Sequence, residues 1–258
     1  MSAVETCYLV AGRMPWNRRV FDEDVKSLPG RWEFIARPEE LSAALLAALR
    51  PRYVFFMHWS WKVPEDICRD YECVCFHMSD VPYGRGGSPL QNLVERGHRR
   101  TKLTALRMVD DMDAGPVYAK EDLSLEGSAE EILIRQSRLA AKMMARLVRE
   151  EPTPIPQAGE PVIFARRKPR DSRIPPLGSL EQLHDFLRML DGEGYPRAFI
   201  EHEGFRYEFS RAGLYDGRVV ADVSVTPIPK EPPAATPSPA EEATPARAPE
   251  PSDPTNRP

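Results

Sequence analysis

The chain is poor in cysteine, in net positive charge and in long apolar runs. Its 258 residues include only four cysteines, too few and too clustered for a disulfide framework: Cys7, Cys68, Cys73 and Cys75. Lys and Arg number 35 against 39 Asp and Glu, so no overall positive field recruits nucleic acid or an anionic membrane. No apolar segment approaches the ~20 residues of a membrane span, and no secretory signal is recognisable. We therefore expect a cytoplasmic protein with reduced cysteines and no membrane partner.

Aromatic residues are absent after Tyr215, and 11 of the 27 prolines fall within residues 227–258. Such a segment cannot bury enough apolar surface to offset its ordering entropy. We therefore predict a disordered Pro-rich tail over residues 227–258. The remaining sequence divides by its pattern into a domain at residues 1–158 and a small β-rich C-terminal domain at residues 159–226.

The pattern of residues 1–158 predicts an α/β domain. Apolar runs of strand length occur at residues 8–11, 32–35, 53–57, 73–76 and 102–109. Helical spacing occurs at residues 38–49 and 64–71, and from the capping box of Ser128 and Glu131 to Pro152. Alternating strands and helices predict a parallel sheet with ligand sites at the carboxyl ends of its strands. In the second domain, a helix at residues 180–190 precedes strands near 199–200, 207–209 and 219–225.

Two polar loops follow predicted strands and contain the candidate catalytic residues. The first is rich in glycine and proline and begins at His77; the second contains Asp110, Asp111 and Asp113. Because carboxyl ends of parallel strands share one edge, we expect His77 to lie near one of these acids, a pairing suited to acid–base chemistry. From the residues alone, a glycine-rich connection and solvated acids remain the alternative.

The order of these residues resembles the 10-formyltetrahydrofolate-dependent formyltransferase family. The family loop stands here as Cys75-Phe76-His77-Met78-Ser79-Asp80-Val81-Pro82, followed by Arg85-Gly86. The later Leu-Asp-Thr-Gly of the family stands as Met112-Asp113-Ala114-Gly115. Residues 186–199 resemble the β-rich C-terminal domain of several members. The resemblance covers about residues 50 to 215, is nearest to the sugar-nucleotide N-formyltransferases, and implies a Rossmann-like formyltransferase domain.

The resemblance implies formyl transfer from 10-formyltetrahydrofolate to a primary amine, most consistently that of a nucleotide-linked amino-sugar, without a metal. His77 would polarise the formyl oxygen and Asp113 would relay the amine proton. Cys75 stands where the family has a catalytic Asn, and a thiol is a weak donor, so His58 is a candidate substitute. The alternatives are a methionyl-tRNA formyltransferase and a non-catalytic binder of folate or a sugar nucleotide. The acidic balance argues against nucleic acid, and a homodimer stays open.

The remaining site residues also follow from the resemblance and from loop position. Residues expected to bind the folate co-substrate are Trp59, Trp61, Val63, Arg85, Gly86, Asp110 and Gly115. Residues expected to bind the acceptor substrate are Trp16, Asn17, His58, Ser79 and Tyr83. For the two tryptophans of residues 59–61, burial in the core is the competing interpretation. Cys73 and Cys75 have no second pair at zinc-ligand spacing, so we expect no metal site.

Overall fold

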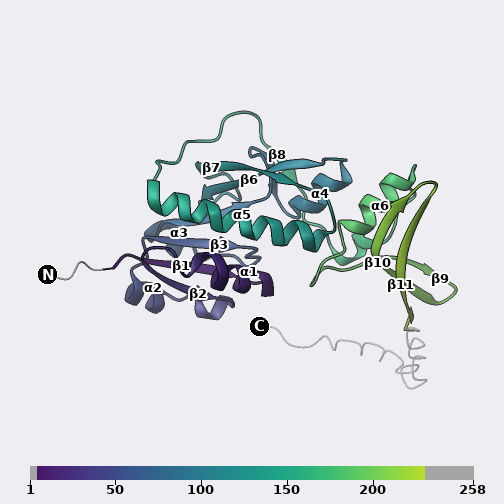
Figure 1. Cartoon of the computed structure of the whole chain (residues 1–258), viewed down its shortest axis with the longest axis horizontal. Coiled ribbons are helices and arrows are strands. Elements are labelled where there is room, and N and C mark those ends of the chain that lie inside the picture. The colour runs from purple at the N-terminus through teal and green to yellow at the C-terminus, as the bar shows by residue number, and fades with distance from the viewer. Residues whose placement is uncertain (1–4, 230–258) are drawn as a thin grey trace, which may run out of the picture.

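A six-stranded sheet forms the centre of the computed structural model, which describes residues 5–229 (Figure 1). Its strand order is β2-β1-β3-β4-β6-β7. The strands are β1 (Cys7–Gly12), β2 (Arg31–Ile35), β3 (Tyr53–Met57), β4 (Cys73–His77), β6 (Arg100–Arg107) and β7 (Val117–Ser124). The predicted α/β fold is confirmed, with a sheet in which β1 to β4 run parallel.

The predicted parallel sheet is confirmed for β1 to β4, but β6 and β7 depart from it. β6 runs antiparallel to β4, and β7 antiparallel to β6. The chain between β4 and β6 contains only the short strand β5 (Tyr83–Gly86) and the helix α4 (Pro89–Glu95). This connection leaves and re-enters the sheet at the same edge, so no crossover returns the chain to the opposite edge, as a parallel pairing requires.

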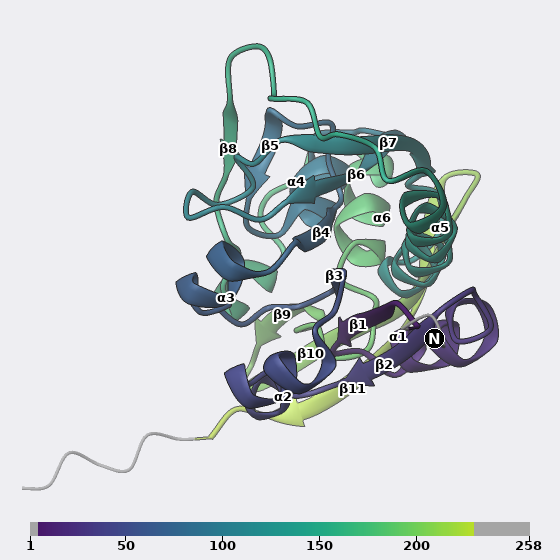
Figure 2. The same ribbon diagram turned by 90° about the vertical axis from the view of Figure 1, so that its left-hand side faces the viewer.

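Helices cover both faces of the sheet, which explains why its central strands are apolar throughout. One face packs against α1 (Pro15–Val20), the π-helical turn Phe21–Val25 and α5 (Ala129–Glu150). The other packs against α2 (Ala43–Leu49) and α3 (Glu65–Asp70), as Figure 2 shows. Leu9 and Val10 point to opposite faces, and both are fully buried. Burial on both faces is what a central parallel strand requires.

Two helix starts test the sequence signals for capping. The predicted capping box begins α5: Glu131 N donates to Ser128 Oγ at 3.3 Å, and Ser128 N donates to Glu131 Oε2 at 2.8 Å. The predicted helix at residues 38–49 is instead divided into a 3-10 turn, Pro38–Glu40, and α2. The division occurs because Ser42 caps α2 by accepting the Leu45 N–H at 3.2 Å, which places Ser42 outside the helix.

The C-terminal module contains α6 and a three-stranded antiparallel sheet, and it lies at one end of the molecule (Figure 1). Its elements are α6 (Leu180–Arg188), β9 (Ala198–His202), β10 (Phe205–Tyr215) and β11 (Arg218–Pro227), preceded by β8 (Val162–Phe164) and the 3-10 turn Pro169–Ser172. The β-rich module is thus confirmed, with longer strands than the sequence predicts. A buried Arg188–Asp185 pair fixes the module: Arg188 Nη1 donates to the carbonyls of Leu125 and Gly127 at 2.6 and 2.8 Å.

The predicted domain boundaries lie after residues 158 and 226. β8 pairs with β5 of the first domain across the predicted boundary at residue 158, and the boundary itself stays a prediction. β11 includes Pro227, the first residue of the predicted tail. Residues 230–258, where most of that prediction falls, lie outside the described residues. Among residues 5–229, no helix has both the length and the apolar character that crossing a membrane requires.

Candidate active site

A cavity of about 790 Å³ opens where β1, β3 and β4 end and extends to the C-terminal module. Its walls come from several chain segments that lie far apart in the sequence. They include Arg13 and Met14 after β1, His58 to Val63 after β3, Cys75 to Met78 at the end of β4, several residues of the loop 108–116, and Arg166 to Pro169 with Tyr195 from the C-terminal part. This location agrees with the expectation of a ligand site at the carboxyl ends of parallel strands.

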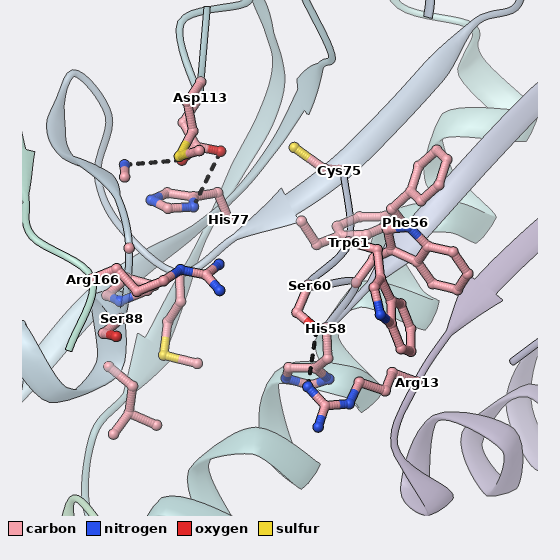
Figure 3. Close-up of a pocket in the computed structure, with 18 of the residues that line it drawn as sticks. Arg13, Phe56, His58, Ser60, Trp61, Cys75, His77, Ser88, Asp113 and Arg166 are labelled. Atoms are coloured by element: carbon pink, nitrogen blue, oxygen red, sulfur yellow. Dashed lines mark hydrogen bonds and ion pairs between the residues drawn. The ribbon is translucent and has the colours of Figure 1, made fainter. Parts of the chain in front are cut away.

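His77 and Asp113 face each other inside this cavity, as Figure 3 shows. His77 Nδ1 lies 3.4 Å from Asp113 Oδ1, and His77 Nε2 lies 2.7 Å from the carbonyl oxygen of Gly84. A carbonyl only accepts, so Nε2 must donate there, whereas a neutral imidazole has a single N–H. A hydrogen bond between His77 Nδ1 and Asp113 therefore requires a second proton, carried either by the ring nitrogen or by the carboxyl group. Such a pair is suited to moving a proton.

The two loops meet, but not at one sheet edge as the sequence predicts. Val74 pairs with Arg107 and His77 with Thr104, so β6 ends at the edge opposite to His77. The loop 108–116 instead folds back along the sheet past Cys75 to bring Asp113 to His77. Asp113, rather than Asp110 or Asp111, is therefore the carboxylate at His77; Asp110 lines the cavity and Asp111 is exposed.

Two glycines shape the approach of this loop. Gly86 has φ +103° and donates its backbone N–H to Asp113 Oδ2 at 2.9 Å. A Cβ at Gly86 would lie 2.6 Å from the Phe164 carbonyl oxygen, so only glycine fits. A Cβ at Gly115 would collide with the Arg107 carbonyl oxygen. Gly86 lines the cavity, whereas Gly115 acts by letting the loop pass close to β6.

Cys75 lies on the same face of β4 as His77 and lines the cavity. Burial first, and the charge of Asp113 second, raise the pKa of the Cys75 thiol, so the group stays protonated. It offers the cavity a weak S–H donor in place of the amide that the family pattern has at this position.

His58 is not free to replace that amide. Asn17 Nδ2 donates to His58 Nδ1 at 2.9 Å, and His58 Nε2 donates to Gln136 Oε1 at 2.8 Å. Burial lowers the pKa of His58 to about 4, so the ring is neutral and both of its nitrogens are occupied. Asn17 is fully buried and also donates to Ser137 Oγ at 3.0 Å. These polar groups support the end of β3, and they leave neither nitrogen of His58 free for a ligand.

An aromatic compartment occupies the other side of Cys75 in Figure 3. Trp59 packs edge-on against Phe56 at 5.9 Å and against Trp61 at 4.9 Å between ring centroids. Arg13 lies over the Trp61 ring at 5.6 Å and donates to Ser60 Oγ at 2.9 Å. Trp61 is 38% exposed, which excludes the interpretation of this residue as core. Trp59, Trp61 and Val63, which we expect to bind the folate co-substrate, line the cavity.

Several predicted ligand-binding residues lie outside the cavity wall and make internal contacts instead. Ser79 is fully buried and donates to the Gly84 carbonyl at 3.1 Å, and the Tyr83 hydroxyl lies 3.0 Å from His98 Nε2. Trp16 is buried with its ring edge-on to His58. Arg85 directs two donors at Gln157. These residues therefore stabilise the loop that follows His77 and the side chains packed near it.

Sequence reasoning did not assign Arg13, Arg166 or Tyr195 to the site, although all three line the cavity. Arg13 directly follows the end of β1, a position that could have indicated it. Arg166 begins a basic run at residues 166–170, which composition alone could not place near His77. In Figure 3 Arg166 lies on the His77 side of the cavity and Arg13 on the aromatic side.

Comparison with known proteins extends this picture. A family model described as "Methionyl-tRNA formyltransferase, C-terminal domain" matches residues 169–226. The methionyl-tRNA formyltransferase of Methylobacterium nodulans is 32% identical over 157 residues, which cover 57% of this chain and 50% of that protein. Eight curated methionyl-tRNA formyltransferases match over 33% to 55% of their length, so the chain spans about half or less of each.

Solved structures match over more of the chain. A methionyl-tRNA formyltransferase from Clostridium thermocellum is 41% identical, with a TM-score of 0.82, covering 86% of this chain and 99% of that one. A 4-N formyltransferase from Francisella tularensis has the same fold, with a TM-score of 0.59 at 14% identity over 88% of this chain and 99% of that one. The identity and coverage of the first of these structures, together with the motif residues gathered in one cavity, show that the chain belongs to the formyltransferase family.

Proposed function

We propose that this protein transfers a formyl group from 10-formyltetrahydrofolate to a primary amine. The observation that carries the proposal is the His77–Asp113 pair, which shares one cavity with the aromatic compartment and with Arg166 in a formyltransferase-family chain. The aromatic compartment suits a flat donor molecule, and Arg166 suits an acceptor that bears phosphate.

The aromatic compartment fits the folate co-substrate. Phe56, Trp59 and Val63 form apolar walls, which suit a flat heteroaromatic ring. The Trp59 indole N–H is buried and, among the described residues, has no hydrogen-bond partner. A buried donor without a partner costs free energy, which a ligand acceptor at this position would recover. Bound folate would supply the activated formyl group.

His77 and Asp113 would perform the proton transfers. A nucleophilic amine must lose a proton, and the departing nitrogen must gain one. Asp113 is held by the Gly86 N–H on one oxygen and faces His77 with the other, so it can accept the amine proton and share it with the ring. An imidazolium at His77 would stabilise the negative charge that develops on the formyl oxygen, with the Cys75 thiol adding a weak donor.

For the acceptor, the comparisons favour methionyl-tRNA over the amino-sugar nucleotide expected from the sequence. The relative with 41% identity over nearly its whole length is a methionyl-tRNA formyltransferase. Arg166 and Lys168 are exposed residues of the cavity wall, where they can meet phosphate groups, and Figure 3 shows Arg166 on the His77 side. The amino-sugar nucleotide remains the second candidate, supported by the net charge of -4.

The test offers the full chain 10-formyltetrahydrofolate with either methionyl-tRNA or a panel of amino-sugar nucleotides. Mass spectrometry then detects gain of one carbonyl group on the amine. We expect formyl-methionyl-tRNA, formed at a rate that falls steeply with salt because phosphate contacts release counterions. Transfer only to an amino-sugar would assign the second acceptor. Folate binding with no transfer to any amine would contradict the proposal and support a binding protein.

A further inference from the structure

The loop 108–116, which contains Asp113 and is called the acid loop below, is bound from outside by Gln157. All hydrogen-bonding groups of the Gln157 side chain are engaged there. It lies in the connection between α5 and β8, outside the cavity wall. Its Nε2 donates to the backbone carbonyls of Asp113 at 2.8 Å and Gly115 at 2.7 Å. Its Oε1 accepts from Arg85 Nε at 3.0 Å and Nη2 at 2.8 Å.

The partners dictate which way the Gln157 amide faces. A guanidinium can only donate, so it must meet the amide oxygen; backbone carbonyls can only accept, so they must meet the amide nitrogen. Arg85 thereby fixes the orientation in which Gln157 can hold Asp113 and Gly115. Glutamate at this position would keep the contact with Arg85 but would turn a second acceptor toward the two carbonyls.

The Gly86 N–H holds the Asp113 side chain at 2.9 Å, but among the described residues only Gln157 binds the Asp113 and Gly115 carbonyls. Asp113 has φ +53°, in the left-handed region that a residue with a Cβ occupies at a cost. The neighbouring Met112 is 68% exposed and Val109 is 42% exposed, so apolar packing adds little. Gln157 itself is well anchored, because Ile155 exchanges backbone hydrogen bonds of 2.8 Å with Val117 on β7.

We infer that Gln157, oriented by Arg85, is a positioning residue that keeps the Asp113 carboxylate in register with His77. The inference rests on the proposed formyl transfer, for which Asp113 must face both the ring and the amine. Gln157 acts through the backbone of Asp113 and touches no reacting atom. The connection between the two parts of the chain thus contributes directly to the geometry of the acid.

The experiment compares Gln157→Leu and Gln157→Glu with Asp113→Asn and a matched control, Gln182→Leu. Gln182 is an exposed glutamine on α6 whose Oε1 accepts the Gly178 N–H at 2.7 Å, far along the chain from the acid loop. The first readout is the ¹⁵N chemical shift of His77 Nδ1, which reports the proton shared with Asp113 and needs no turnover. The second is kcat and KM for formyl transfer.

We expect both Gln157 variants to move the His77 signal in the direction of Asp113→Asn, with the control unchanged. We also expect kcat to fall roughly 10- to 100-fold with little change in KM, the effect of misplacing a catalytic group by about 1 Å. Adding Gln157→Leu to Asp113→Asn should cost nothing further. If Gln157→Leu fails to fold, Gln157→Glu, which keeps the Arg85 contact, gives the same comparison.

An unchanged His77 signal in a folded Gln157 variant would overturn the positioning role, whatever the enzyme's acceptor. A further loss of activity on the Asp113→Asn background would also overturn it, because Gln157 would then act by another route. Absence of transfer by the wild-type protein, with the His77 signal moving as expected, would instead refute the proposed function and leave the positioning role standing.

Discussion

His77 and Asp113 lie 3.4 Å apart although the strands that precede them end at opposite edges of the sheet. The contact therefore depends on the return path of the loop 108–116, which Gly115, Gly86 and Gln157 define. Small changes in this path should alter catalysis before they alter folding, because the loop buries little apolar surface.

Asp113→Asn should lower kcat by about 10²- to 10⁴-fold, since the amide keeps the shape but cannot take a proton. Asp111→Asn is the matched control: its side chain is exposed, and only its backbone carbonyl takes part in the turn to Ala114. Steady-state kinetics on both variants measure the difference. Equal losses would mean that the loop, rather than one carboxylate, is needed.

Cys75→Asn should raise kcat by up to about 100-fold, the contribution of one oxyanion donor. We expect this gain because both nitrogens of His58 are already hydrogen-bonded, so His58 does not supply the donor that an Asn at position 75 would provide. Cys75→Ala should change kcat little, since the protonated thiol is a weak donor. A fall in turnover on Cys75→Asn, measured with either acceptor, would show that another group fills the site.

Stability should decrease as pH falls from 6.5 toward 4, in part through His58. The folded-state pKa of His58 is about 4, below its ordinary 6.5, so the unfolded chain takes up this proton first. Each unit of that difference corresponds to about 1.4 kcal/mol of unfolding free energy. His58→Gln cannot titrate, so its melting temperature should fall less steeply over this range; identical slopes would contradict the assignment.

Arg188→Met should destabilise the protein by about 3–5 kcal/mol, because it removes the 2.7 Å ion pair with the buried Asp185 and leaves that carboxylate only Arg99, at 3.1 Å, as a cationic partner. The same change also removes the donors to Leu125 and Gly127 that join α6 to the first domain. Arg173→Met, at an exposed ion pair with Glu201, should cost less than about 1 kcal/mol. Chemical denaturation measures both, and a similar cost for the two would contradict the role of burial.

The sequence predicted which candidate residues lie close together better than it predicted the path that brings them there. Period-two alternation put Cys75 and His77 on one face, and the family pattern selected Asp113 among three acids; the structure agrees with both. Strand direction is not encoded in such local patterns, because β6 has the same apolar alternation in either orientation. The antiparallel β6 therefore could not be predicted, and neither could the route of its loop.

Some residues were expected to bind ligand only because they follow His77 closely in the sequence. Ser79, Tyr83 and Arg85 follow His77 closely, yet the turn between β4 and β5 directs them into hydrogen bonds with Gly84, His98 and Gln157. Gln157 itself had no signal, because a single glutamine among prolines belongs to no periodic pattern. Its role depends on a carbonyl pair that only the folded loop presents.

The pairing of β5 with β8 has a consequence for the ancestry of the molecule. On β5, Gly86 donates to Asp113 and Arg85 donates to Gln157, while the connector that enters β8 brings Gln157 and then Arg166 to the same region. Exchange of the C-terminal module by recombination at residue 158 would keep Gln157 with the loop 108–116 but would replace β8, the partner of β5, and Arg166 in the cavity wall. A functional chimera must therefore inherit residues 159–168 together with the first domain, so the unit that can be exchanged begins after β8 and not at the predicted boundary.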